Sequence, residues 1–196
     1  MNTTHTAAAV DEVIRERRTV KPDKFNGEQI PEAAFTQILA AADWAPTHAY
    51  TEPWLFFVYA GDKAQEICHQ HAALYKSATA AEKFNQSSYD KFYTMGDKAS
   101  HVVIAAMKRG NNPNIPAIEE IAATSAAIQN LLLAATARGI ASFWSTGGMT
   151  LREPFKAELG LGEEDQVLGL LYFGYTDAEP PVGKRMRPAQ EKFIWK

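Results

Sequence analysis

The chain of 196 residues contains a single cysteine, Cys68. One thiol cannot form a disulfide within its own chain, so we expect a reducing compartment, the cytoplasm. Long apolar runs are also missing. The longest, around residues 102–107 and 167–175, fall far short of the roughly 20 residues that a membrane-spanning helix needs. Residues 1–10 lack a cationic start followed by an apolar run, so we expect neither a signal peptide nor a membrane partner.

An excess of charge of one sign is absent as well. The 20 basic and 23 acidic residues give a net charge of −3, which argues against nucleic acid as a partner. Hydrophobic residues make up 46% of the chain, as in an ordinary globular protein. The chain shows no internal repeat or low-complexity linker, and its length suits one domain spanning residues 1–196.

Several motifs that carry chemistry are missing. The sequence has no dinucleotide-binding glycine fingerprint, no phosphate-binding P-loop and no serine nucleophile elbow. A zinc motif is absent too, and His69 and His71 would point in different directions on a helix. We therefore expect no metal, and we assign no side chain as a catalytic acid, base or nucleophile. Cys68 has no basic cluster near it in sequence and is interpreted as a buried structural thiol.

Hydrophobic periodicity and helix-breaking residues predict an α+β fold, because helices and strands mix without a regular βαβ rhythm. Pro116 and Gly139 bound the clearest helix, with Glu119 and Glu120 in its first turn. Its alanines and Ser125 form a small-residue surface that favours a central helix at a subunit interface. The expected helices span 7–18, 32–42, 116–138 and 151–159, with two helical pieces in 62–100; the expected strands span 55–59, 101–107, 140–144, 167–175 and, at the sheet edge, 191–195.

Basic residues gather at two places despite the acidic net charge. The first basic cluster lies where the first helix ends and consists of Arg15, Arg17, Arg18, Lys21 and Lys24. The other gives residues 184–196 a local charge of +4, from five basic residues and Glu191. Guanidinium and hydroxyl groups match phosphate oxygens, so the two clusters could share a phosphate site after an extended proline-containing arm over 177–188. Two solvated basic faces are the alternative, and charge alone favours that alternative.

Four segments in order carry a resemblance to a known family. They are Arg17-Arg18-Thr19-Val20-Lys21; Ala45-Pro46-Thr47-His48 with Glu52-Pro53-Trp54; the helix from Ser125 to Ala135 leading to Trp144-Ser145-Thr146-Gly147; and Phe173-Gly174-Tyr175 before the basic arm. Their order and spacing resemble the nitroreductase family, most closely its short YdjA-type members. The resemblance covers the chain from about residue 10 to its end.

The resemblance implies a four- to five-stranded mixed or antiparallel sheet flanked by helices, in an intertwined homodimer with FMN at the interface. It also implies contacts for the FMN. Arg17 and Thr19, with Arg18 or Lys21, would hold the phosphate and ribityl chain, and the basic arm would close on the same phosphate. His48 would reach the flavin from the other subunit. The remaining residues implied are Trp144, Ser145 and Thr146 along the flavin ring, and Lys184, Arg185 and Arg187 in the arm.

Some positions depart from the family pattern. Residues 49–52 read Ala-Tyr-Thr-Glu where larger members carry polar contacts to the ring edge, and Trp44 stands where short relatives can have a basic residue. The helical insertion of larger members is reduced here to roughly residues 77–98, which we expect to form part of a lid. The alternative for His48 is that it simply ends the second helix, and the alternative for Trp144 is a core aromatic residue. We keep the packing interpretation for Trp54.

The implied activity is an FMN-dependent NAD(P)H oxidoreductase. Hydride would pass from NAD(P)H through flavin N5 to an electron-poor acceptor, such as a nitroaromatic or a quinone, with ping-pong kinetics. Two other functions fit the same residues. One is a flavin-dependent dehydrogenase or oxidase of a specific metabolite on the same scaffold, and the other is a non-enzymatic flavin-binding module.

Overall fold

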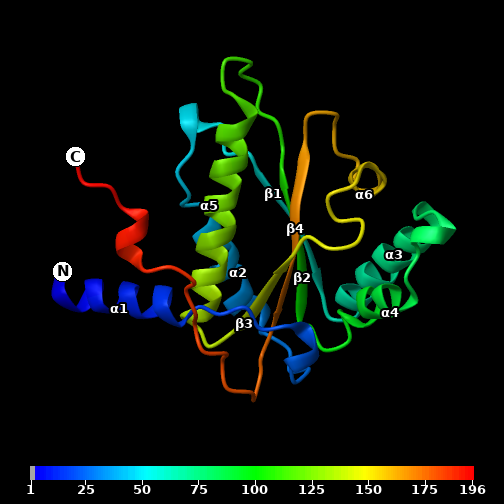
Figure 1. Ribbon diagram of the computed structural model, residues 1–196, viewed down its shortest axis with the longest axis horizontal. Helices are drawn as coiled ribbons and strands as arrows, with labels where there is room; N and C mark the ends of the chain where they lie inside the picture. The colour runs from blue at the N-terminus through cyan, green and yellow to red at the C-terminus, as the bar shows by residue number, and fades with distance from the viewer. Residues whose placement is uncertain (1–2) are drawn as a thin grey trace.

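The computed structural model describes residues 3–196, which fold into helices and strands joined by short loops (Figure 1). The strands are β1 (Trp54–Ala60), β2 (His101–Met107), β3 (Ala141–Ser145) and β4 (Gln166–Gly174). The longer helices are α1 (Thr3–Glu16), α2 (Glu32–Ala42), α3 (Asp62–Ala78), α4 (Gln86–Thr94), α5 (Ala117–Thr136) and α6 (Glu153–Glu158). Single 3-10 turns are η1 (Pro22–Lys24), η2 (His48–Tyr50), η3 (Ala81–Lys83) and η4 (Ala189–Lys192).

The strands form one antiparallel sheet in the order β1-β2-β4-β3. Beyond β3, residue Thr19 makes a parallel bridge to Ser142 and so extends the sheet by a short fifth segment. This architecture confirms the predicted α+β class with four to five strands. The β2 strand is buried along its whole length, because helices cover both faces of the sheet at its centre.

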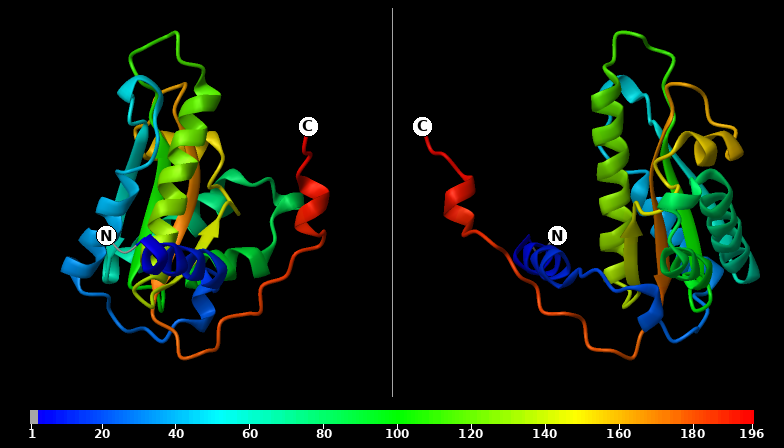
Figure 2. Two further views of the ribbon diagram at one scale, coloured as in Figure 1. Left: turned by 90° about the vertical axis from the view of Figure 1, so that its left-hand side faces the viewer. Right: turned by 45° about the vertical axis from the view of Figure 1, so that its right-hand side comes forward.

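Helices α2 and α5 cover one face of the sheet, and α3, α4 and α6 lie on the other (Figures 1 and 2). Each face has its own apolar core. The first core packs residues of α2 and α5, such as Ile38 and Leu131, against Val103 and Leu171 of the strands. The second core packs α3 against the opposite side of the same strands. The two cores fix α5 against β3, which is the junction where the candidate site lies.

Cys68 lies in the second core and is fully buried. Burial raises the pKa of its thiol to about 12, because a thiolate would lose its hydration there. The prediction of a buried structural thiol is therefore confirmed.

Both ends of the chain project from the same side of the molecule (Figure 2). The predicted arm over 177–188 is extended and exposed. The expected edge strand at 191–195 was wrong: Ala189–Lys192 form the turn η4, and no strand pairing is present there in the described chain. A strand needs a neighbouring edge, and the arm leads its aromatic residues Phe193 and Trp195 away from the sheet into solvent.

Candidate functional site

A cleft of about 340 Å³ opens where the segment after α1 runs beside β3 and α5. Its walls are side chains from these three elements and from the start of the loop after β3, namely Arg17, Thr19, Gln129, Leu132, Ser142, Trp144 and Thr146. Four of these residues were predicted for the site from sequence, and they come from positions more than a hundred residues apart. The structure therefore brings the Arg17 segment and the Trp144 segment into one cavity.

Main-chain bonds hold the Arg17 segment in this place. The Val20 amide donates to the Ser142 carbonyl at 3.0 Å, and Thr19 bridges the same residue of β3. The Arg17 amide donates to Val13 O and ends the helical bonding of α1. Arg17 is half-buried and Thr19 is exposed. A guanidinium and a hydroxyl thus stand at the mouth of the cleft on a rigid backbone, where they could bind an anion.

Trp144 forms a fixed wall of the cleft. Its indole Nε1–H donates to the Leu168 carbonyl at 2.9 Å, while the exposed 36% of the side chain faces the cleft side of β3. The indole crosses β4 directly over Gly169, where an added Cβ would collide with it. Glycine is required at residue 169 for this close approach, since any larger side chain would displace the ring.

The loop after β3 is held by a histidine that was not predicted as a site residue. His71 Nε2 accepts a hydrogen bond from the Met149 amide at 3.0 Å, and an added Cβ on Gly148 would strike the imidazole. Burial lowers the pKa of His71 to about 4, so the ring is neutral and its Nε2 lone pair is free to accept. Ser145 does not line the cleft; its hydroxyl accepts from the Gly147 amide within this loop.

The basic arm reaches the cleft at one point. Gly183 lies against the Arg18 guanidinium, since an added Cβ there would collide with it. Arg18 in turn donates to the Arg17 carbonyl at 2.8 Å. Beyond Gly183 the arm residues Lys184, Arg185 and Arg187 are exposed, and they lie outside the cleft lining, as does Lys21 on the other side. The structure thus places the arm beside the first basic cluster without closing it over the cleft.

A model of the Nitroreductase family matches residues 14–175 of the chain. The chain belongs to the nitroreductase family. It is 28% identical over 148 residues to the "Putative NAD(P)H nitroreductase YdjA" of Escherichia coli (strain K12), a match that covers 76% of each chain. The predicted resemblance to short YdjA-type members is confirmed.

Solved nitroreductase structures share the fold. A nitroreductase-like family protein from Bacillus cereus superposes with a TM-score of 0.78 at 27% identity, covering 95% of both chains. The FMN-dependent nitroreductase NfnB from Mycobacterium smegmatis, solved with NADPH, gives a TM-score of 0.71 at 20% identity over 97% of this chain and 99% of that one. These likenesses confirm the predicted nitroreductase-like fold.

His48 occupies the other end of the nitroreductase fold from the Arg17 cleft. It lies on η2, where its Nδ1 is 2.6 Å from Glu119 Oε2 at the start of α5. Gln129 of the cleft follows ten residues later on the same helix, so roughly 15 Å separates the two positions at the α-helical rise. Within one protomer, therefore, His48 does not reach the cleft that Arg17 lines.

Three cleft residues of this nitroreductase were not expected as site residues: Gln129, Leu132 and Ser142. Gln129 is the one detectable signal, because it and Asn130 interrupt the apolar residues of α5 and Gln129 is exposed. Over the described part of the chain, no group of three or more His, Cys, Asp or Glu side chains could hold a metal ion. No helix in residues 3–196 has the length and apolar character to cross a membrane.

Proposed function

We propose that this nitroreductase is an FMN-dependent oxidoreductase that uses NAD(P)H to reduce a small electron-poor acceptor. One observation carries the proposal. The bridge from Thr19 to Ser142 places the Arg17 side chain and the Trp144 wall on the same cleft. A cavity lined by a cation, a hydroxyl and an aromatic side chain suits a ligand that has a phosphate tail and a flat ring.

The donor set of the cleft fits FMN. Arg17 and Thr19 would hold the phosphate, with Arg18 beside them. Gln129 and the Ser142 hydroxyl could donate to the ribityl chain. Because Gly183 already contacts Arg18, a small movement of the arm would bring Lys184, Arg185 or Arg187 onto the same phosphate. Lys21, which is exposed two residues beyond Thr19, could reach it from the opposite side.

A second protomer would complete this site. Helix α1 exposes Val10 and Ile14, and an apolar groove of about 660 Å³ runs between α1 and the end of α5, through Ala9, Val13 and Leu133. The arm adds Val182, Met186 and Trp195, all more than four-fifths exposed. Surfaces of this kind mark a protein interface. We propose that they pair in an intertwined homodimer, in which His48 of one protomer enters the Arg17 cleft of the other.

Bound FMN would supply a two-electron carrier that takes hydride from NAD(P)H and passes it to an acceptor, such as a nitroaromatic or a quinone, in a ping-pong cycle. The protein's own contribution is positioning. Arg17 neutralises phosphate charge, Trp144 limits where a flat ring can lie, and His71 fixes the loop that follows Thr146. A cation near the ring would also favour an anionic reduced state electrostatically.

The first test compares two cations on the same segment. Arg17→Ala should weaken FMN binding by about 10- to 100-fold, since a charge-assisted hydrogen bond contributes about 1.5–3 kcal/mol. Lys24→Ala is the matched control, because Lys24 is exposed and lies outside the cleft lining. The dissociation constant is measured by quenching of flavin fluorescence on titration into apoprotein. Equal FMN affinities in the two variants would contradict the placement.

Turnover separates the proposed activity from its alternatives. Steady oxidation of NADPH with nitrofurazone, giving parallel double-reciprocal lines, is the expected result. Retained FMN without oxidation of NADPH or NADH would point to a metabolite-specific enzyme on this scaffold. FMN that stays oxidised with every reductant would point to a non-enzymatic flavin-binding module.

A further inference from the structure

A second, larger cleft of about 720 Å³ lies at the opposite end of α5 from the Arg17 cleft. One wall is η2 with the residues that lead into β1, and the other is the loop between β2 and α5, residues 108–116. The two walls are in contact: the Lys108 amide donates to the Pro53 carbonyl at 2.7 Å. Gly110 approaches Thr51 so closely that an added Cβ would lie 3.1 Å from the threonine methyl. The cleft is thus formed by two loops packed against each other.

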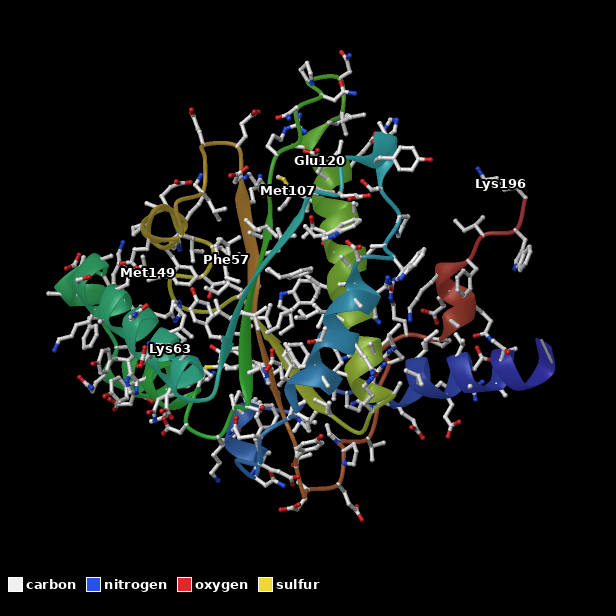
Figure 3. The ribbon with its side chains drawn as sticks, turned by 180° about the vertical axis from the view of Figure 1, so that it is seen from behind. Phe57, Lys63, Met107, Glu120, Met149 and Lys196 are labelled. Atoms are coloured by element: carbon white, nitrogen blue, oxygen red, sulfur yellow. The ribbon has the colours of Figure 1, made fainter. Side chains whose placement is uncertain are left out.

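A buried ion pair makes the wall formed by residues 108–116 rigid. Arg109 Nη1 pairs with the fully buried Glu120 carboxylate, and Arg109 Nη2 donates to the Ile115 carbonyl at 2.6 Å. The Gly110 amide donates to the same carboxylate at 3.1 Å, and the Arg109 amide donates to Asp165 at 2.8 Å. Figure 3 shows Glu120, in the first turn of α5, near Met107, the last residue of β2. These bonds engage both terminal guanidinium nitrogens of Arg109, so its charge is compensated by Glu120 inside the protein.

The wall formed by η2 and the residues that lead into β1 carries backbone strain. Ala49, Tyr50 and Glu52 all have positive φ, between 44° and 54°, a conformation that non-glycine residues adopt at an energetic cost. The Thr47 hydroxyl stabilises the loop by accepting from the Glu52 amide at 3.1 Å. Tyr50, which lines the cleft, is 89% exposed. Strain of this kind is maintained where the surrounding structure holds it, and it clusters at ligand sites.

The free side chains of this cleft match the parts of a nucleotide. Lys108 is exposed, and its Nζ has neither an ion pair nor a hydrogen bond with any residue that the structure describes. A lysine ammonium beside the amides of Asn111 and Asn112 suits phosphate oxygens. Tyr50 offers an accessible ring on which a base could stack, and the Glu52 carboxylate could accept from ribose hydroxyls.

We propose that this second cleft binds the adenosine-phosphate half of the NAD(P)H that reduces the flavin of the partner subunit. The inference rests on the proposed function, because it requires FMN in the Arg17 cleft and His48 entering that cleft from the other protomer. Tyr50 is two residues from His48 on the same turn. A nucleotide that reaches the flavin beside His48 could therefore extend its other half onto Tyr50 and Lys108, which line the same cleft.

The test measures nucleotide affinity in the FMN-loaded protein. Lys108→Gln should raise the NADPH concentration that half-saturates flavin reduction in stopped-flow by about tenfold, the effect of losing one charge-assisted contact. The dissociation constant of NADP⁺, measured by calorimetry without turnover, should rise by a similar factor. Lys98→Gln is the control, because Lys98 is exposed at the other end of β2. Tyr50→Ala should also raise the half-saturating NADPH concentration and the NADP⁺ dissociation constant, whereas Tyr50→Phe should retain the wild-type values.

The phosphate that Lys108 contacts follows from comparing the two coenzymes. A tenfold effect confined to NADPH assigns the 2′-phosphate, and equal effects on NADPH and NADH assign the pyrophosphate; both results support the site. Wild-type constants for both nucleotides in Lys108→Gln and Tyr50→Ala would overturn it while the proposed function stands. Absence of FMN from the purified wild type, or a flavin that neither nucleotide reduces, would overturn the proposed function and this site with it.

Discussion

At the scale of single residues, two buried histidines make stability depend on pH. Burial lowers the pKa of both His71 and His101 to about 4. The unfolded chain protonates histidine near its ordinary pKa of about 6.5, so acid stabilises the unfolded state first. The free energy of unfolding should therefore be highest above about pH 6.5 and fall as pH drops towards 4, by at most about 1.4 kcal/mol per pH unit for each histidine.

Urea unfolding at several pH values in this window measures that slope. His71→Gln keeps an acceptor for the Met149 amide and removes one titrating group, so its slope should be shallower than that of the wild type. An unchanged slope would show that His71 does not carry the effect. The sequence could not reveal this role, because His71 looks like one more polar residue of a helix until the fold packs the loop after β3 against it.

At the scale of elements, the start of α5 depends on its buried ion pair. Glu120→Gln removes the charge that compensates Arg109, whose side chain is only 15% exposed. Breaking one partner of a buried pair costs about 3–5 kcal/mol, so a loss of unfolding free energy of that size is expected in urea. Glu164→Gln is the matched control. Glu164 lies 3.9 Å from the same arginine but is 74% exposed, so its replacement should cost less than about 1 kcal/mol.

A cost of less than about 1 kcal/mol for Glu120→Gln would mean that water or structural relaxation compensates for the lost ion pair.

The helices and strands themselves were largely predictable from the sequence. The predicted helix 32–42 and strand 101–107 have the bounds of α2 and β2, since one has unbroken helical periodicity and the other is a continuous apolar run. The strand predicted at 191–195 was wrong, because its aromatic residues suggested a strand and the absence of a neighbouring strand could not be known from the sequence.

At the scale of the whole molecule, assembly should depend on the aromatic residues of the arm. Phe193 and Trp195 are 63% and 95% exposed in one protomer, and burying each against a partner would contribute about 1.5–3 kcal/mol. The double variant Phe193→Ala with Trp195→Ala should raise the dimer dissociation constant at least about 100-fold. Sedimentation at several protein concentrations provides the measurement, with Lys196→Ala as the control for an exposed arm residue.

If that double variant stayed as dimeric as the control, the aromatic residues of the arm would have no part in assembly.

Hydrophobic periodicity and motif spacing could not predict that the Arg17 segment, the Trp144 segment and the arm come together in the fold. Charge patterning alone favoured two separate solvated faces, and only the resemblance joined Arg17 to Trp144. The Thr19 bridge and the contact of Gly183 with Arg18 are tertiary features, formed because β3 and the arm both pass the end of α1.

The sealed position of Cys68 makes this protein convenient for chemical labelling. With the thiol at 0% exposure and its pKa near 12, a maleimide dye should find no reactive group in the native chain. Lys196→Cys would then carry the only reactive sulfur, at the tip of the arm. Attaching a donor chromophore to one batch and an acceptor to another would let subunit exchange be followed by energy transfer without first mutating the native cysteine.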